Sequence, residues 1–314
     1  MVCLMEKCTP IADFIAPENP VTGVRGVRVI PQCAEAMFGS VMYPLALSGE
    51  GSVIEDSQQA NQIQFIFARL IPHTIRKDLP YEVKLLSKES LNAWCLPGGK
   101  VAVYKLLLDK IDEYTRNGVL ESYVDPETGE VISYEGVSDR DVKGALLGHE
   151  MTHADARHTA RKLEWTGFVQ LCIFGVSAFL QACITKARQS LVSSRRVLTP
   201  ADRSQLAILE NVQKVHNFVF QALVKLGLKL YHLFGSRKHE FEADKYGMQL
   251  AVRAGYDWRG ALYLQEILKR ESGREGTKSC PSFVQEALKW FNTHPSCEER
   301  QVAIVKEAKL LRWA

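Results

Sequence analysis

The stretch His149-Glu150-Met151-Thr152-His153 decides how the fold of this chain is interpreted. In an α-helix, four residues turn about 400° and rise about 6 Å, so the two imidazoles project from one face. Two histidines at this spacing can bind one zinc ion, and the intervening Glu150 can act on a water held by that ion. The stretch therefore predicts a helix that carries a hydrolytic zinc site.

The residues before this motif favour a helix with a buried stripe. Ser138 followed by Asp141 resembles a capping box at a helix start. Val142, Leu146 and then His149 recur at helical spacing, which indicates that the site emerges from the buried face. The alternative is a surface helix with two incidental histidines.

A second segment supplies further ligands. A zinc ion held by two histidines needs at least one more protein ligand. In the segment Ser236–Gly247, Glu240 and Asp244 are four residues apart and share a helix face. Glu240 is the predicted third ligand, and Asp244 is predicted to accept the N–H of a ligand histidine and fix its tautomer. Glu242 is expected to point elsewhere. Without the first motif, both acids would be read as solvated surface residues.

Four stretches, taken in order, carry a likeness to a known family. They are Asn92–Gly99, His149–His153, Ser236–Gly247 with Ala254–Asp257 behind it, and Thr293–Ser296 with Arg300 near the end. These blocks resemble metallopeptidase family forty-eight, the gluzincins that include HtpX-like proteases, CAAX prenyl endopeptidases, and OMA-type and BepA-type proteases. The resemblance implies a mostly α, α+β fold, in which a zinc protease domain with a small antiparallel sheet holds its metal between two helices.

The resemblance also implies a substrate strand. In the family, an exposed edge strand precedes the zinc helix, and a peptide can add to such an edge through main-chain hydrogen bonds. Here that strand would consist of Asn92, Ala93, Trp94, Cys95 and Leu96, followed by a turn at Pro97-Gly98-Gly99 and a return strand from Val101 to Leu107. The alternative is a purely structural hairpin.

The last block adds two candidate residues. His294 is similar to a family residue that approaches the zinc from the far side, where it donates to the oxyanion or serves as a removable fourth ligand. The alternative is a histidine that caps a loop. Arg300, from the same block, is expected to support the metal ligands from behind.

Motif and resemblance together imply an endopeptidase with one Zn²⁺ per chain, held by His149, His153 and Glu240. Zinc lowers the pKa of its water toward about 7 and polarises a carbonyl, and Glu150 would act as general base. The expected substrate is a protein or peptide, and many relatives act in membrane or protein quality control. The alternative is a latent, zinc-bound member that acts as a chaperone-like binding module.

Composition fits an enzyme that works without nucleic acid. With 314 residues, 46% of them hydrophobic, the chain can bury a substantial core. A net charge of +3 and a pI near 8.3 give no concentrated basic surface, so we expect no nucleic-acid partner. The eight cysteines are scattered, and no secretion signal is visible at the start. We therefore expect a cytoplasmic or membrane-associated protein whose site faces the cytoplasm.

The predicted organisation has two parts. Residues 1–60 form a loop-rich N-terminal extension, and residues 61–314 form the zinc protease domain with an inserted hairpin at 119–137 and an apolar helical insertion at 165–234. The first helix is expected at Gln58–Leu70. Later helices are expected at Met248–Ala254, Gly260–Arg270, Pro281–Phe291 and Glu298–Leu311.

The apolar insertion leaves two interpretations open. Residues 165–185 carry no charge and are long enough to cross about 30 Å of hydrocarbon. Both zinc motifs must lie on one side of a membrane, so a crossing needs a return segment. The candidate return, 218–234, contains Lys225 and Lys229, which are costly in lipid. The insertion is therefore either a pair of buried or interfacial helices or a membrane hairpin through 165–185 and 218–234.

Overall fold

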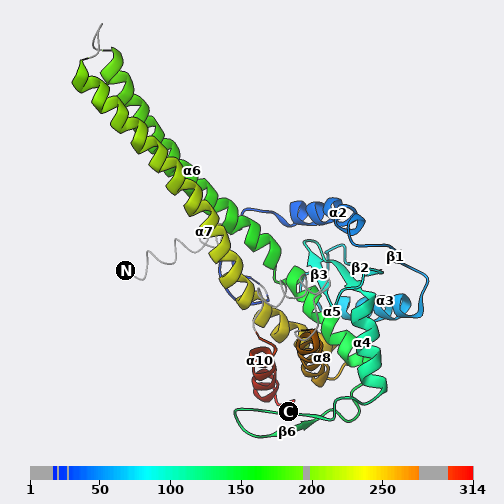
Figure 1. Ribbon diagram of the computed structural model, residues 1–314. Coiled ribbons are helices and arrows are strands. Elements are labelled where there is room, and N and C mark those ends of the chain that lie inside the picture. The colour runs from blue at the N-terminus through cyan, green and yellow to red at the C-terminus, as the bar shows by residue number, and fades with distance from the viewer. Residues whose placement is uncertain (1–16, 20, 27, 194–198, 276–295, 314) are drawn as a thin grey trace, which may run out of the picture. The chain divides into compact units, whose positions relative to one another are not determined.

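The computed structural model describes residues 17–19, 21–26, 28–193, 199–275 and 296–313, and the chain divides into two compact units (Figure 1). The first unit extends to Arg161 and resumes at Gly235, and the second is Lys162–Phe234. Helices predominate and the strands are short, which confirms the predicted mostly α, α+β class.

The elements follow one another in this order: α2 Gln32–Ser48, β1 Val53–Ile54, α3 Gln58–Leu70, a 3₁₀ turn Ile71–His73, β2 Glu82–Leu86, β3 Ala93–Leu96, β4 Lys100–Tyr104, α4 Lys105–Arg116, β5 Ser122–Val124, β6 Val131–Ser133, α5 Asp139–Asp155, α6 His158–Ser193, α7 Pro200–Arg253, α8 Arg259–Glu275 and α10 Cys297–Leu310. The bounds of α3 agree with the predicted helix. The helix expected at Pro281–Phe291 lies outside the described residues.

The four-stranded sheet is mixed rather than purely antiparallel. Its strand order is β1-β2-β4-β3, with β3 antiparallel to β4 and β2 parallel to β4. After β3 the chain turns at Gly98 and Gly99, whose φ angles of 79° and 76° favour glycine, and β4 then inserts between β3 and β2. β4 ends at Tyr104, earlier than the predicted return strand, because Lys105 already begins α4.

The two faces of the sheet pack against different helices. One face contributes Val83, Leu85, Val101 and Val103 to the main core, which also contains the buried residues of α3, α4 and α5. The other face forms a smaller cluster of Leu86, Ala102, Tyr104 and Trp94 with Tyr43 of α2. The edge strand β3 is thus supported on both faces.

Helix α2 lies within the segment 1–60, so Gln58 does not begin the first helix. Its apolar side chains Met37, Val41 and Leu45 are exposed, whereas the buried positions are Glu35, Gly39 and Tyr43, so its sequence shows no apolar stripe. Besides the packing of Tyr43, a buried charge holds it in place. Glu35 pairs with Arg76 at 2.9 Å and with Arg157 at 3.0 Å.

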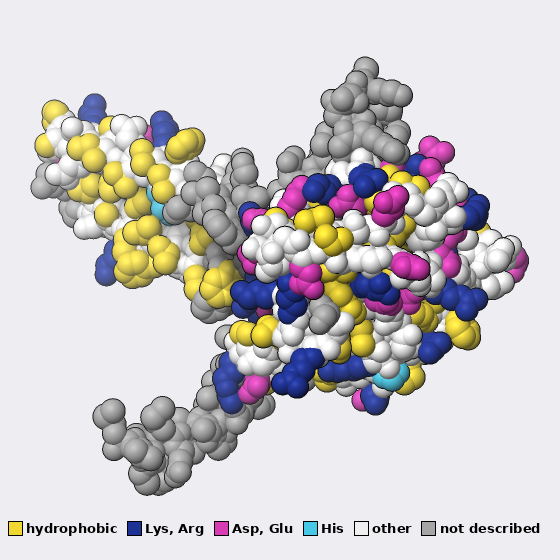
Figure 2. Space-filling model, turned by 90° about the horizontal axis from the view of Figure 1, so that it is seen from below, with side chains coloured by type: hydrophobic (Ala, Val, Ile, Leu, Met, Phe, Trp, Pro, Cys, Tyr) yellow, Lys and Arg dark blue, Asp and Glu magenta, His cyan; other side chains and the backbone are white. Residues whose placement is uncertain are grey.

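The second unit is a pair of helical segments from α6 and α7, which run side by side (Figure 1). The rings of Phe174 and Phe220 lie 5.5 Å apart, and Arg188 pairs with Glu210 at 2.6 Å. The helical stretch Asp139–Ser193 contains an 18-residue window with a mean hydropathy of 1.9 and no buried residue. Figure 2 shows such apolar side chains at the surface, and Leu171 and Phe179 are 71% and 69% exposed. The described apolar side chains of α6 are thus mostly exposed within this unit, and the choice between buried or interfacial helices and a membrane hairpin stays a prediction.

Candidate metal centre

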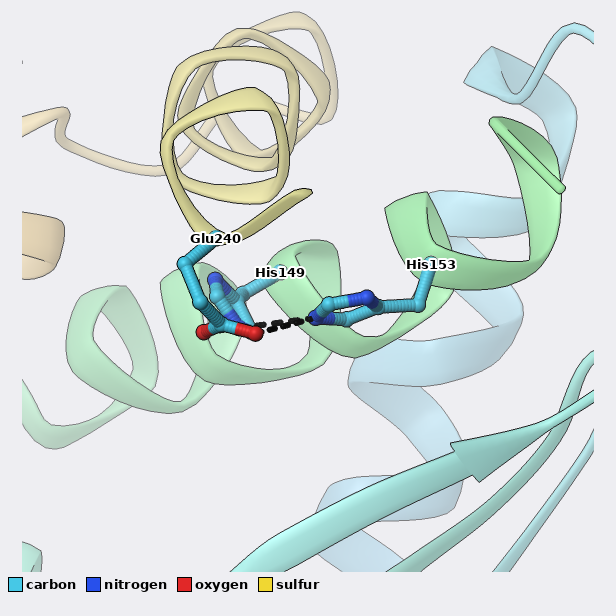
Figure 3. Close-up of side chains that lie close together, drawn as sticks. All are labelled: His149, His153 and Glu240. Carbon is cyan, nitrogen blue, oxygen red and sulfur yellow. Dashed lines mark hydrogen bonds and ion pairs between the residues drawn. The ribbon is translucent and has the colours of Figure 1, made fainter. Parts of the chain in front are cut away.

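The two zinc motifs meet in the first unit. His149 and His153 project from α5, and Glu240 projects from α7 toward them (Figure 3). Glu240 carboxylate oxygens lie 3.4 Å from His149 Nε2 and 3.6 Å from His153 Nε2. The two ring nitrogens are 3.2 Å apart, and one ligand atom from each residue lies within 4.8 Å of the others.

Two glycines allow α5 and α7 to approach this closely. A Cβ on Gly148 would lie 2.5 Å from the carbonyl oxygen of Gly247, and a Cβ on Gly247 would lie 2.6 Å from the amide nitrogen of His149. Real Cβ atoms essentially never come so close to another atom, so a side chain at either position would push the helices apart. The capping box of Ser138 and Asp141, as predicted, starts α5.

Glu150 is buried one residue beyond the first histidine. Only 7% of its surface is exposed. Burial raises its pKa to about 7, against the lowering effect of charge on His149 and with a further raising effect from Glu240. A carboxylate with a pKa near neutrality can both accept and return a proton at physiological pH.

Asp244 and Arg300 lie behind His149, next to the ligand that they are predicted to support. Asp244 Oδ1 lies 3.0 Å from His149 Nδ1. Arg300 donates to both Asp244 oxygens, at 2.6 and 2.5 Å, and is only 2% exposed. Burial acts to raise the pKa of Asp244, but the charge and hydrogen bonds of Arg300 outweigh it and hold that pKa below its usual value. Asp244 therefore stays a carboxylate that accepts from the ring.

Two residues near His153 were missed by the sequence reasoning. His158 Nδ1 lies 3.0 Å from His153 Nδ1, and His158 Nε2 lies 3.0 Å from Glu242 Oε2. Glu242 points away from the three converging groups, as expected, but its carboxylate contacts this second ring. Spacing gave no signal for His158. Five residues turn about 500° on a helix, away from the face of His153.

The interruption of the helix between α5 and α6 places His158 against His153. Arg157 has a φ of 58°, a left-handed conformation unusual for a residue with a side chain. Its guanidinium donates to Glu35 at 3.0 Å and to the carbonyl oxygen of Ile30 at 2.8 Å, which holds it there. This residue separates the end of α5 from the start of α6.

The predicted substrate strand lies beside the site. No strand among the described residues pairs with the outer edge of β3. Cys95 is a free thiol whose pKa is raised well above its usual value, first by burial and then by the charge of Glu150. Trp94 points to the opposite face, where its Nε1 donates to the hydroxyl of Tyr104 at 3.2 Å. Asn92 accepts the Tyr104 amide at 3.2 Å just before the strand.

His294 lies outside the described residues, so its predicted approach to the metal stays a prediction. Ser296 is the next described residue, and its side chain caps α10 by accepting a hydrogen bond from the amide of Glu299 at 3.2 Å.

The three converging side chains fit a zinc ion chemically. Two imidazole nitrogens and one carboxylate are the donor set of many hydrolytic zinc sites, which keep a further position open. His149 and Glu240 are 8% and 3% exposed, so water competes weakly for them. Burial alone would lower the pKa of His149, but hydrogen bonds to Asp244 and Glu240 raise it to about 10. A metal ion would therefore replace a proton on this ring.

Comparison with known proteins extends this picture. The Peptidase family M48 model matches residues 57–308. A mitochondrial metalloendopeptidase OMA1 from Schizosaccharomyces pombe is 26% identical over 235 residues, which are 75% of this chain and 49% of that protein. The protein of the same name from Arabidopsis thaliana is 24% identical over 289 residues, 85% of this chain and 43% of that protein.

A third relative, the metalloendopeptidase OMA1, mitochondrial, of Bos taurus, is 24% identical over 221 residues, 70% of this chain and 31% of that protein. The chain thus spans less than half the length of these curated relatives. The family match, in contrast, covers most of the chain and includes both halves of the metal centre. The chain therefore belongs to peptidase family M48, the metallopeptidases that its motifs resemble.

Proposed function

We propose that the chain is a zinc-dependent endopeptidase that cleaves protein or peptide substrates. The observation that carries the proposal is the convergence of His149, His153 and Glu240, with Glu240 oxygens 3.4 and 3.6 Å from the two rings, in a chain of this family. Side chains from helices far apart in the sequence rarely bury a carboxylate between two imidazoles without a ligand to share.

The proposed chemistry assigns a role to each side chain. Zinc held by His149, His153 and Glu240 would acidify a water and polarise the scissile carbonyl. Glu150 would take up a proton from the attacking water and pass it to the leaving amine, a task that suits its pKa of about 7. Asp244, fixed by Arg300, keeps the Nδ1–H of His149 engaged, so that Nε2 faces the metal. No covalent intermediate with the protein is required.

The proposed substrate site is the free edge of β3. An extended peptide would add to this edge through main-chain hydrogen bonds. The charge of Glu150 acts on the thiol of Cys95 in this strand, so the edge lies near the proposed general base. Support on both faces of the sheet keeps the strand rigid, which helps to align a scissile bond. We further propose that the catalytic domain includes α2, since Tyr43 packs against Trp94 with ring centroids 5.9 Å apart.

We also propose that the second unit attaches the protein to a membrane as a helical hairpin. The exposed apolar window of α6 supports this proposal by length and composition. The three relatives are named as mitochondrial, so a mitochondrial membrane is a second candidate besides a membrane on which the site faces the cytoplasm. A role in membrane-protein quality control would fit either location. Carbonate extraction of fractionated cells tests this. Recovery of the wild-type protein in the soluble fraction would refute membrane attachment.

The proteolytic proposal is tested with the purified full chain and casein. We expect cleavage that a chelator stops and that stoichiometric zinc restores. Glu240→Ala should lose both bound zinc and cleavage, whereas Glu210→Ala, an exposed acid on the same helix, should keep both. A wild-type protein that holds zinc yet leaves casein and unfolded proteins intact would favour the latent, chaperone-like alternative.

A further inference from the structure

We propose that His158 and Glu242 are positioning residues that hold His153 in the ring tautomer able to bind the metal. This inference rests on the proposed zinc site. It assigns His153 a hydrogen-bond partner that fixes its tautomer, as Asp244 is proposed to do for His149. His149 is served directly by a carboxylate, that of Asp244. For His153, the geometry points to a carboxylate that acts through an intervening imidazole.

The three groups form a continuous hydrogen-bonded chain. His153 Nδ1 and His158 Nδ1 are 3.0 Å apart, and His158 Nε2 is 3.0 Å from Glu242 Oε2. His158 is 2% exposed, and its ring stacks on that of His239 with centroids 4.3 Å apart and planes 8° from parallel. The ring of His158 is therefore fixed in position and in plane.

The carboxylate of Glu242 determines the direction of both hydrogen bonds in this row of three side chains. Glu242, as a carboxylate, can only accept hydrogen bonds, and its charge lies 3.6 Å from Arg161 and 3.7 Å from Lys238. His158 Nε2 must therefore carry the proton that it shares with Glu242. The ring of His158 is only 2% exposed, and such burial disfavours a second proton on it, so Nδ1 is left as an acceptor.

The proton on His153 follows from this orientation. Since His158 Nδ1 accepts, His153 Nδ1 must donate. The lone pair of His153 is then on Nε2, the atom that lies 3.6 Å from Glu240 Oε1 and 3.2 Å from His149 Nε2. The reverse orientation would set the lone pair of His158 Nε2 against the Glu242 carboxylate at 3.0 Å, which is repulsive. Only the first orientation presents a metal-binding nitrogen to the site.

The helix geometry explains why an imidazole intervenes. Glu242 follows Glu240 by two residues, so the two side chains leave α7 about 200° apart. With Glu240 directed at the metal, Glu242 cannot lie against the ligand ring itself. His158, which follows Arg157 at the start of α6, lies between His153 and Glu242. One helix thus serves both sides of the site, directly through Glu240 and indirectly through Glu242.

Two substitutions at one position separate this role from plain packing. In His158→Asn, the amide oxygen falls near the place of Nδ1 and can still accept from His153. In His158→Leu, a side chain of similar size offers no acceptor. His73→Leu, at an exposed histidine, is the matched control. Zinc affinity of the full chain is measured by competition with a chromophoric chelator, and the melting temperature is measured without metal.

We expect His158→Leu to weaken zinc binding about 10- to 100-fold, the usual loss when the partner of a ligand histidine is removed. His158→Asn should recover most of the affinity, although both variants lose similar stability without metal. His73→Leu should bind like wild type. Equal zinc affinities of the Leu and Asn variants would overturn the proposal, because an acceptor on residue 158 would then not matter.

A measurement on the unmodified sequence keeps the test independent of folding. In metal-free protein labelled with ¹⁵N-histidine, ring nitrogen shifts distinguish the two tautomers, and the His153 signals are assigned by their loss in His153→Gln. We expect a protonated Nδ1 and an unprotonated Nε2. A protonated Nε2 would overturn the inference while leaving the zinc site intact. A wild-type protein that binds no zinc would instead refute the proposed function.

Discussion

Helix α5 and the apolar stretch of α6 follow one another in the chain, yet they have opposite surroundings. In α5 every residue from Val142 to Thr152 is buried, including Lys143, His149 and Glu150. In α6 the uncharged stretch is exposed, with Leu171 at 71%. The helix with more polar residues is thus buried, whereas the described apolar side chains of α6 are mostly exposed.

The difference teaches that burial depends on partners more than on apolarity. Lys143 can be buried because its ammonium pairs with Asp112 and Asp139, and His149 because its ring pairs with Asp244. Among the described side chains, the apolar ones of α6 have few partners and stay mostly exposed, which is the observation behind the proposed membrane attachment. The proposed chemistry belongs to the first helix and the proposed attachment to the second.

The largest expected effect separates these two roles. Glu150→Gln keeps the size of the buried side chain but removes its ability to accept a proton, so cleavage of a soluble peptide should fall about 10²- to 10⁴-fold. Bound zinc should be unchanged, because Glu150 is not among the three converging groups. Phe179→Ser, in the exposed stretch, should leave the same rate unaltered. Peptide cleavage rates and metal analysis check both, and full activity of Glu150→Gln would exclude it as the base.

The next effect concerns buried charges in the first unit. Glu35→Ala leaves Arg76 and Arg157 without their shared carboxylate, so the free energy of unfolding should fall by about 3 to 5 kcal/mol. Glu55→Ala, which removes an exposed partner of Lys84, should cost at most about 1 kcal/mol. Urea denaturation of the full chain measures both. Equal losses would mean that α2 is not anchored by its buried charge.

A pair of glycines tests the close packing of α5 against the open surroundings of α6. Gly148→Ala places a Cβ 2.5 Å from a backbone oxygen and should destabilise the protein by about 1 to 3 kcal/mol while also weakening zinc binding. Gly175→Ala meets no atom within 4 Å and should raise helix stability by up to about 1 kcal/mol. Thermal unfolding and zinc competition record both outcomes. A neutral Gly148→Ala would show that the helix spacing is not set by this contact.

The sequence predicted those features that depend on local spacing. The bounds of α3, the capping of α5 by Ser138 and the meeting of Glu240 with the histidine pair all follow from helical periodicity and ligand chemistry. The roles of these ligands stay predictions until they are measured.

Features that depend on strand order, on an interrupted helix or on partners from elsewhere in the chain were not predicted. The parallel pairing of β2 with β4 depends on the order of strands, which no local pattern encodes. His158 reaches the site only because Arg157 adopts a positive φ. Helix α2 is held by the ion pairs of Glu35 rather than by an apolar stripe, so periodicity could not reveal it.

The smallest expected effect is a pH dependence confined to the buried helix. Without metal, the pKa of His149 is about 10, because the hydrogen bonds to Asp244 and Glu240 outweigh the lowering effect of burial. The ring is therefore protonated near pH 6, and zinc must displace that proton to bind. Zinc affinity should fall about tenfold for each unit by which the pH is lowered in this range, which corresponds to about 1.4 kcal/mol per unit.

Calorimetry in buffers of different ionisation enthalpy counts the protons released by zinc near pH 6. At this pH a zinc-bound water, with a pKa near 7, still keeps its proton, so it adds little to the count. Burial lowers the pKa of His153 well below its usual value, so that ring adds none. At least one proton should therefore be released per zinc, and Phe179→Ser on α6 should give the same count as wild type. A heat of binding independent of the buffer would mean that His149 is already neutral before zinc binds. Its contact with Asp244 would then orient the ring without keeping it protonated.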